Sequence, residues 1–325
     1  MSLSLFKSPG AVMLLDDDAT FLEMMALVLP PEWPLRLLLR PSECVAQLTR
    51  QRTVRDADRW RQQEIVERWH KIRMPLVPQI LDYWRQSPAR YQLTQVAVVD
   101  YSMPAMDGFQ VLAALHDWPG MRILLTGRAD DQLAVDAFNQ GLIQQFVPKQ
   151  AADMVQRLLA AIRRLQAAAE PRVAQIWRST LSPRQYALLH LPSVTRALEE
   201  WSERHWVEHA VIGTPFGLLG RDAGGNASWL QLEAAGDLDE LVESMDAADL
   251  STAELDDVRR GHKLVDFELR QVLGIQDRVE LRPAFAIGND EPLLGASFSL
   301  PDQPDDSSSS FGQFMAQQTA RRVEQ

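Results

Sequence analysis

Cysteine is almost missing from this chain: Cys44 is the only one among 325 residues. One cysteine excludes an internal disulfide and any metal site built from several thiolates. We therefore expect Cys44 to be a small apolar side chain on a helix. Long apolar runs are missing as well, and about 18 such residues in a row would be needed for a transmembrane helix.

Two further absences concern targeting and catalysis. Residues 1–18 contain no signal-peptide cleavage pattern, so we expect the protein to be cytoplasmic. The chain has no Gly-rich phosphate-binding loop, no histidine-rich metal motif and no serine nucleophile elbow. These absences disfavour an enzyme with an output domain of known catalytic type, and we expect no enzymatic activity.

Negative charge is unevenly distributed along the chain. Residues 1–169 carry 19 basic and 18 acidic side chains, whereas residues 170–325 carry 14 basic and 26 acidic ones. Because acidic surfaces repel phosphate backbones, the second half is poorly suited to conventional DNA binding. A transcriptional regulator with an unrecognised DNA-binding half remains an alternative, and salt-dependent binding to nonspecific DNA would favour it.

The first half alternates apolar segments of strand length with segments of helical spacing. The strand-type segments are residues 11–18, 34–40, 95–100, 121–127 and 143–149. A helical pattern follows each of them, as in the spacing of Phe21, Met24, Met25 and Val28. This alternation predicts an α/β domain, a parallel sheet with helices on both faces.

Polar side chains follow the strand-type segments at the edge where such sheets bind ligands. Asp16 and Asp17 end the first segment, Asp100 the third, Thr126 the fourth and Lys149 the fifth. Carboxylates that lie this close repel one another unless a cation lies among them. Oxygen ligands of this kind suit Mg²⁺, and the amine and hydroxyl suit phosphoryl oxygens.

These residues, in this order, and the loop sequence DYSMPAMDG resemble the receiver domain of two-component response regulators. The resemblance covers about residues 10–168 and implies a flavodoxin-like, five-stranded doubly wound sheet. It implies that Asp100 accepts a phosphoryl group from a histidine kinase or a phosphotransfer protein. The insertion and residues 124–142 of this chain also resemble a subgroup of response regulators found in α-hydroxyketone quorum-sensing circuits.

The same resemblance implies roles for the surrounding residues. Mg²⁺ would be bound directly by Asp17 and Asp100, by Asp16 through water, and by the backbone carbonyl of Ser102. Lys149 would pair with the phosphoryl group.

Thr126 would turn its hydroxyl toward the phosphoryl group. Phe146 stands where the family carries a switch aromatic, and the alternative is a permanently buried core residue. We expect Asp18 to cap the first helix instead of binding metal.

The sequence departs from the family pattern near the site. A proline usually follows the lysine, whereas here Pro148 precedes Lys149. This order leaves the geometry of the lysine loop open. Arg128 lies two residues after Thr126, where a long cationic side chain could slow hydrolysis of the phosphorylated aspartate. A solvated arginine is the simpler interpretation.

Residues 53–93 form an insertion relative to the family pattern. They contain three tryptophans and two stretches of helical spacing separated by Pro75 and Pro78. The insertion could pack on its own receiver, or it could contact a second subunit or a kinase. We expect one face of the insertion to pack on the receiver and the other to contact a second subunit or a kinase. Because Trp is enriched at interfaces, we expect the insertion and the connector helices to hold a homodimer.

The second half predicts a different architecture. Residues 170–206 read as a helical connector, and residues 301–325 as a disordered tail. Residues 207–300 read as two strands with a Gly224-Gly225 turn, then helices, then three strands. This order resembles a PAS domain, so we expect an α+β, PAS-like output domain that acts by contact with another protein.

Overall fold

The computed structural model describes residues 3–127, 131–167, 171–245, 250–289, 293–301 and 310–323. They fall into two compact units. The receiver unit comprises Pro9–Arg59, Pro88–Glu170 and Met315–Gln325, and the second unit comprises Met1–Ser8, Trp60–Ser87 and Pro171–Phe314. None of the described helices is both long and apolar enough to cross a membrane.

A five-stranded parallel sheet forms the centre of the receiver unit, in the order β3-β2-β4-β5-β6. Its strands are β2 (Ala11–Leu15), β3 (Leu35–Leu38), β4 (Thr94–Asp100), β5 (Met121–Thr126) and β6 (Gln145–Pro148). All five residues of β2 are buried. Strands covered on both faces need such continuous apolar runs.

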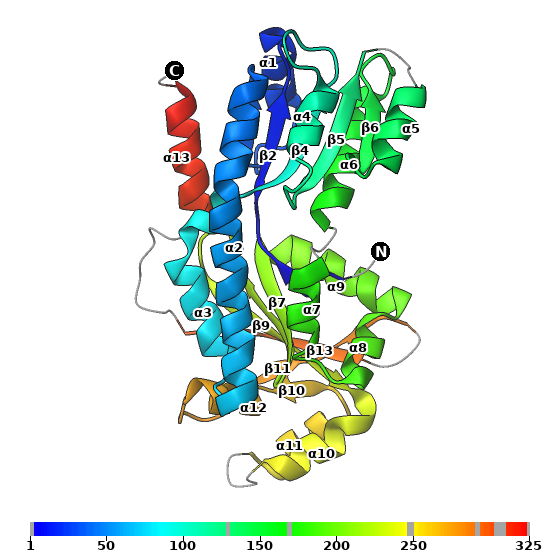
Figure 1. Cartoon of the computed structure of the whole chain (residues 1–325). Coiled ribbons are helices and arrows are strands. Elements are labelled where there is room, and N and C mark those ends of the chain that lie inside the picture. Colours follow the sequence, from blue (N-terminus) through cyan, green and yellow to red (C-terminus); the bar gives the residue numbers. More distant parts are fainter. Residues whose placement is uncertain are drawn as a thin grey trace. The chain divides into compact units, whose positions relative to one another are not determined.

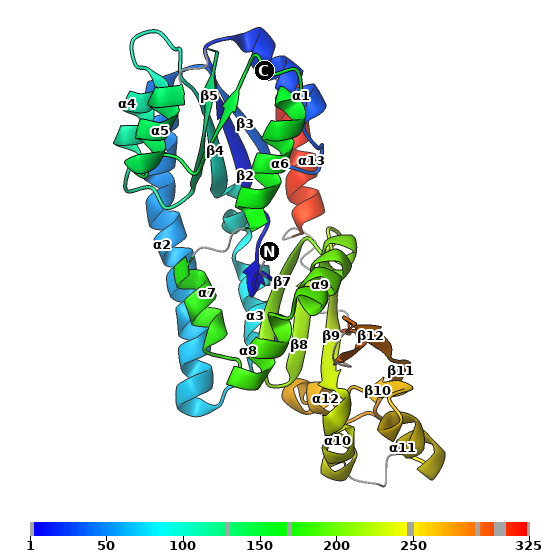
Figure 2. The ribbon, with the colours of Figure 1, turned by 90° about the vertical axis from the view of Figure 1, so that its right-hand side faces the viewer.

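Helices cover both faces of this sheet (Figure 2). They are α1 (Ala19–Val28), the first part of α2 (Pro41–Ile72), α4 (Gly108–Ala114), α5 (Asp131–Asn139) and α6 (Met154–Ala167), with the short 3₁₀ helix η1 (Pro88–Gln92). One apolar core joins the sheet to α1 and α6, and the other joins it to α2, α4 and α5. The predicted doubly wound receiver fold is therefore confirmed.

Cys44 lies on α2 and is fully buried in one of these cores. Its thiol contacts Met13 Sδ at 3.6 Å, and burial raises its pKa to about 12. The predicted role of a small apolar side chain is confirmed.

An antiparallel sheet forms the centre of the second unit, in the order β1-β7-β8-β9-β13-β12 (Figure 1). Its strands are β1 (Phe6–Lys7), β7 (Glu208–Gly213), β8 (Phe216–Arg221), β9 (Ala227–Ala234), β12 (Phe285–Ile287) and β13 (Leu293–Ser299). A separate ladder pairs β10 (Lys263–Val265) with β11 (Leu281–Pro283). The predicted α+β class is confirmed.

The helices of the second unit come from several parts of the chain. They are the second part of α2, α3 (Leu76–Gln86), α7 (Pro171–Arg178), α8 (Pro183–Leu189), α9 (Pro192–His205), η2 (Ala235–Asp237), α10 (Leu238–Ser244), α11 (Thr252–Arg259) and α12 (Phe267–Leu273). The helices predicted within residues 170–206 are thus α7, α8 and α9. Their apolar faces join the core of this unit.

The insertion differs from its prediction in where it packs. Residues 60–87 belong to the second unit, where Trp84 is fully buried and Trp69 packs against the core. Trp60, by contrast, is 66% exposed. Residues 60–87 therefore do not pack on the receiver as expected, because their apolar side chains complete the other core, whereas residues 53–59 and 88–93 belong to the receiver unit.

The N-terminus also differs from our expectation that residues 1–169 form the receiver domain. Leu3, Leu5 and Phe6 are buried in the core of the second unit, and Phe6 stacks on Trp177 with ring centroids 4.8 Å apart. Strand β1 pairs with β7 through Phe6 and Ala210. The receiver sheet begins only at Ala11.

The PAS-like prediction is not confirmed. Residues 207–234 form three consecutive strands, because a second turn separates β7 from β8, instead of the expected two. The segment after Asp266, expected as a strand, is helix α12, which ends at Gly274 in the left-handed conformation.

The tail is also partly different from its prediction. Residues 311–323 form helix α13 (Phe311–Val323) instead of a disordered segment. Residues 302–309 of the predicted tail lie outside the described residues.

Candidate functional site

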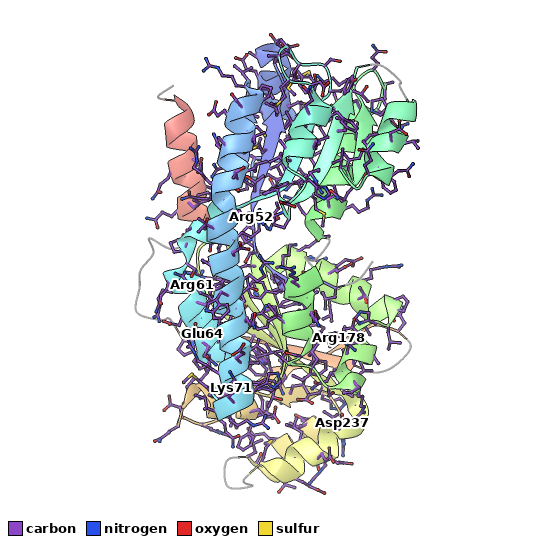
Figure 3. All side chains as sticks on the ribbon, in the orientation of Figure 1. Arg52, Arg61, Glu64, Lys71, Arg178 and Asp237 are labelled. Atoms are coloured by element: carbon purple, nitrogen blue, oxygen red, sulfur yellow. The ribbon has the colours of Figure 1, made fainter. Side chains whose placement is uncertain are left out.

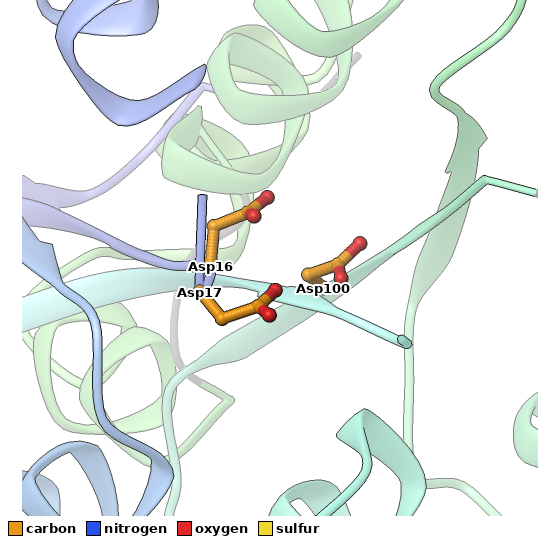
Figure 4. Close-up of side chains that lie close together, drawn as sticks. All are labelled: Asp16, Asp17 and Asp100. Carbon is orange, nitrogen blue, oxygen red and sulfur yellow. The ribbon is translucent and has the colours of Figure 1, made fainter. Parts of the chain in front are cut away.

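Three carboxylates meet at the carboxyl edge of the receiver sheet. Leu15 pairs with Val99 across β2 and β4, which brings the next residues, Asp16 and Asp100, side by side. One oxygen each from Asp16, Asp17 and Asp100 lies within 4.8 Å of the others (Figure 4). Asp16 and Asp100 are buried, whereas Asp17 is exposed.

Lys149 joins the two buried carboxylates. Its Nζ lies 2.5 Å from Asp16 Oδ2 and 2.7 Å from Asp100 Oδ1. The backbone N–H of Lys149 donates to the carbonyl of Thr126 at 2.8 Å, which continues the β5–β6 ladder past Pro148. The sheet itself therefore positions the lysine.

Burial and charge change the proton affinities in this group. Burial raises the pKa of Asp16, the Lys149 hydrogen bond opposes this effect, and the charge of Asp100 adds to it. Burial lowers the pKa of Lys149, but its hydrogen bonds to Asp100 and Asp16 outweigh burial, and the net change is upward. The ammonium is therefore firmly protonated at neutral pH.

The donor set fits a divalent cation. Apart from the Lys149 ammonium, Asp16 Oδ2 and Asp100 Oδ1 have no hydrogen-bond partner among the described residues. Three carboxyl groups face one ammonium at the site. Mg²⁺ prefers carboxylate oxygens and retains several waters, so a few ligands from the protein suffice. Asp16, Asp17 and Asp100 are the residues that could hold it.

The loop after Asp100 is held by short-range contacts. The backbone N–H of Ser102 donates to Asp100 Oδ2 at 3.0 Å, and the N–H of Gly108 donates to the carbonyl of Tyr101. A Cβ on Gly108 would lie 2.2 Å from the Asp100 carbonyl oxygen, so no larger residue fits there. The predicted role of the Ser102 carbonyl as a metal ligand stays a prediction.

Asp18 caps helix α1, as predicted. Its carboxylate accepts hydrogen bonds from the N–H groups of Thr20 at 2.9 Å and Phe21 at 3.2 Å. Phe21 is a residue that the sequence analysis missed: the Lys149 ammonium lies 4.6 Å from its ring centroid. The apolar pattern of α1 does not indicate this cation–π contact, in which the Phe21 ring stabilises the Lys149 ammonium.

The remaining predicted residues lie around the site. Thr126 ends β5 and is buried. Phe146 lies on β6 and is 37% exposed, which excludes the alternative of a buried core residue in this structure. Arg128 lies outside the described residues.

Comparisons with known proteins bear on the whole chain. No protein-family model matches the sequence. No curated protein matches it either. The response regulator LqsR of Legionella pneumophila is similar in structure, with a TM-score of 0.72 and 23% sequence identity over 96% of this chain and 95% of that one.

Two receiver domain proteins match the first half only. The protein from Methanospirillum hungatei is 17% identical over 49% of this chain and 94% of its own, with a TM-score of 0.33. The protein from Clostridium thermocellum is 18% identical over 48% and 94%, also with a TM-score of 0.33. Together with the strand order and the site described above, the LqsR comparison shows that this chain has the fold of a response regulator with a CheY-like receiver.

Proposed function

We propose that this protein is the response regulator of a two-component phosphorelay and accepts a phosphoryl group on Asp100. The supporting observation is the group formed by Asp16, Asp17 and Asp100, with the Lys149 ammonium within 2.7 Å of the two buried carboxylates. A histidine kinase or a phosphotransfer protein is the proposed donor. The protein would act in the cytoplasm, where such kinases present their phosphohistidine.

The proposed reaction is nucleophilic attack by an Asp100 carboxylate oxygen on phosphorus. The oxygen–phosphorus bond forms, the bond from phosphorus to the donor imidazole breaks, and the imidazole takes up a proton. Lys149 would exchange its contact with Asp100 for one with the phosphoryl oxygens. Mg²⁺, when bound by the three aspartates, supplies positive charge that offsets the charge of the phosphoryl group.

We propose that the output is contact with another protein, and not catalysis or DNA binding. The acidic second half supports this choice, because 26 acidic and 14 basic side chains follow residue 169. A homodimer is part of the proposal. Trp60 supports it, because a tryptophan with 66% of its surface exposed is a typical anchor for a partner.

Acetyl phosphate with Mg²⁺ tests the reaction, with intact-mass measurement as the readout. We expect the unaltered chain to gain the mass of one phosphoryl group and Asp100→Asn to gain none. Asp107→Asn is the matched control, because Asp107 lies in the same loop and caps α4 through Gln110, a role that asparagine also fills. Equal labelling of Asp100→Asn and the unaltered chain would contradict the proposal.

A further inference from the structure

The second unit contains a cavity of about 490 Å³ that the phosphorelay chemistry does not use. Its lining residues come from α8, η2, α10 and α12, from the strands β7, β8 and β9, and from the residues just before α8 and β8. Asp237, one of them, is labelled in Figure 3. Sites for small molecules usually have volumes of about 300 to 1,000 Å³, so the cavity can take a whole small ligand.

The lining combines an apolar part with hydrogen-bonding groups. Phe216, Leu188 and Leu241 supply apolar surface, and Thr214 and Ser182 supply hydroxyl groups. A few polar groups beside an apolar wall are typical of sites that orient an organic ligand. The cavity therefore offers both apolar contact and hydrogen bonds to a ligand.

Negative charge predominates around the cavity. Arg184 is paired with Asp237, whose two carboxylate oxygens both lie 2.9 Å from the guanidinium Nη1. The other three lining carboxylates, Glu233, Glu240 and Glu268, have no cationic partner in the part of the chain that the structure describes. Anions are therefore repelled, and a cation would find uncompensated charge.

Burial and neighbouring negative charge raise the pKa of Glu233, one of these unpaired carboxyl groups. Burial raises its pKa to about 7, the hydrogen bond from Gln231 opposes this, and the charges of Glu268 and Asp237 raise it further. Burial likewise raises the pKa of Glu268. Desolvated carboxylates that repel one another bind a cation more strongly than solvated ones.

Gln231 is the hydrogen-bond partner of Glu233 on strand β9. It lies on the same face of β9 as Glu233, is 1% exposed, and donates from Nε2 to Glu233 Oε1 at 3.0 Å. Its Oε1 has no hydrogen-bond partner among the described residues. Gln231 does not itself line the cavity, and its contribution there is the hydrogen bond that holds the Glu233 carboxylate.

We propose that this cavity binds a small organic amine, with its ammonium group beside Glu233 and Glu268 and its apolar part against Phe216 and Leu188. The ammonium supplies the positive charge and the hydrogen-bond donors that the carboxylates lack. The apolar wall requires a carbon body and so excludes a bare metal ion as the fitting ligand. The second unit would thus sense an amine independently of the phosphoryl group on Asp100.

Three probes with the same aromatic body test the proposal by calorimetry on the full chain: 2-phenylethylammonium, 2-phenylethanol and phenylacetate. They differ in a positive, a neutral or a negative head group. Because hydrogen bonds to charged groups are the stronger ones, we expect the ammonium probe to bind about tenfold or more tightly than the alcohol. We expect no binding of phenylacetate. Equal affinities, or no heat from the ammonium probe at millimolar concentration, would overturn the proposal.

Variants locate the site within the unit. Glu233→Gln and Glu268→Gln should each weaken binding of the ammonium probe about tenfold, because each removes one ionic hydrogen bond. Glu243→Gln is the matched control: it removes the same charge from α10, but Glu243 is exposed and does not line the cavity. An equal loss in Glu243→Gln would show that general charge attraction is responsible and would refute the site. If a variant does not fold, the probe series on the unaltered chain still decides.

Discussion

Lys149 shows how one side chain can keep its place although its neighbours differ from the family pattern. The proline that usually follows the lysine is absent here, and the sequence left the geometry of this loop open. The structure positions Lys149 through its own N–H, which donates to the Thr126 carbonyl at 2.8 Å. A backbone hydrogen bond does not depend on which residue comes next, which explains why the ammonium still reaches both carboxylates.

Glu233 should make stability depend on pH. Its pKa rises from 4.5 to about 7 on folding, so the folded state binds the proton more tightly than the unfolded state does. Stability is therefore lost as pH rises between about 4.5 and 7, and the loss is complete above this range. We expect Glu233→Gln to stabilise the protein on the order of 1–3 kcal/mol at pH 8 and hardly at all at pH 4.5.

Denaturant unfolding at several pH values measures this effect as a difference between variant and unaltered chain. Glu243→Gln serves as the control, because it removes the same type of side chain from an exposed position on α10. A gain from Glu233→Gln that is the same at pH 4.5 and pH 8 would show that the effect does not come from titration.

At the scale of elements, Asp17 and Asp18 are adjacent residues at the start of α1 with different roles. Asp18 caps the helix through Thr20 and Phe21, whereas Asp17 belongs to the carboxylate group. We expect Asp18→Ala to lower the free energy of unfolding by about 1 kcal/mol and to leave Mg²⁺ affinity unchanged. Asp17→Ala should lower Mg²⁺ affinity and leave the free energy of unfolding unchanged, because it removes an exposed carboxylate that is proposed to bind the metal.

Calorimetric Mg²⁺ titration and denaturant unfolding of both variants measure the two effects separately. Each variant is the other's control, since each removes one carboxylate from adjacent positions. Equal loss of Mg²⁺ affinity in both variants would contradict the division of roles between Asp17 and Asp18.

Most elements of the receiver unit were predictable from sequence, and the reason is local. Strands β2, β4 and β5 are apolar runs buried on both faces, and the residues that end them are those of the site. Helix α12 was mistaken for part of a strand because FELRQVL has apolar residues at positions that suit either period. The left-handed Gly274 that ends this helix was the available signal.

The contacts of Phe21 and Gln231 could not be predicted in the same way. Phe21 meets Lys149 at a distance of 128 positions along the chain, and nothing in either local pattern specifies that partner. Gln231 lies on a strand whose pairing was predicted only as part of one hairpin. Such contacts depend on tertiary packing, and periodicity records only which face of an element is buried.

At the scale of the whole molecule, the division of the chain changes which tryptophan should matter for assembly. Trp69 and Trp84 pack within the second unit, so Trp60 is the tryptophan of the insertion that stays exposed. We expect a homodimer that Trp60→Ala weakens about tenfold or more without unfolding the protein, as for a typical interface anchor. Light scattering at several concentrations measures the dimer.

Trp84→Ala is the contrasting variant. Trp84 is fully buried, and its truncation should destabilise the second unit by about 3–5 kcal/mol.

A strict monomer at about ten micromolar and above, before and after phosphorylation, would remove the dimer from the proposal. A Trp60→Ala variant that dimerises like the unaltered chain would place the interface elsewhere.

Strand β1 has a consequence for how the protein is made on the ribosome. Phe6 pairs with Ala210, which is synthesised 204 residues later. At roughly 5–20 residues per second, the first strand waits about 10 to 40 seconds for its partner. The receiver sheet, whose last strand ends at Pro148, can form during that interval. Leu3, Leu5 and Phe6 meanwhile lack the core that covers them in the folded unit, so they are apolar surface that a chaperone of emerging chains could bind.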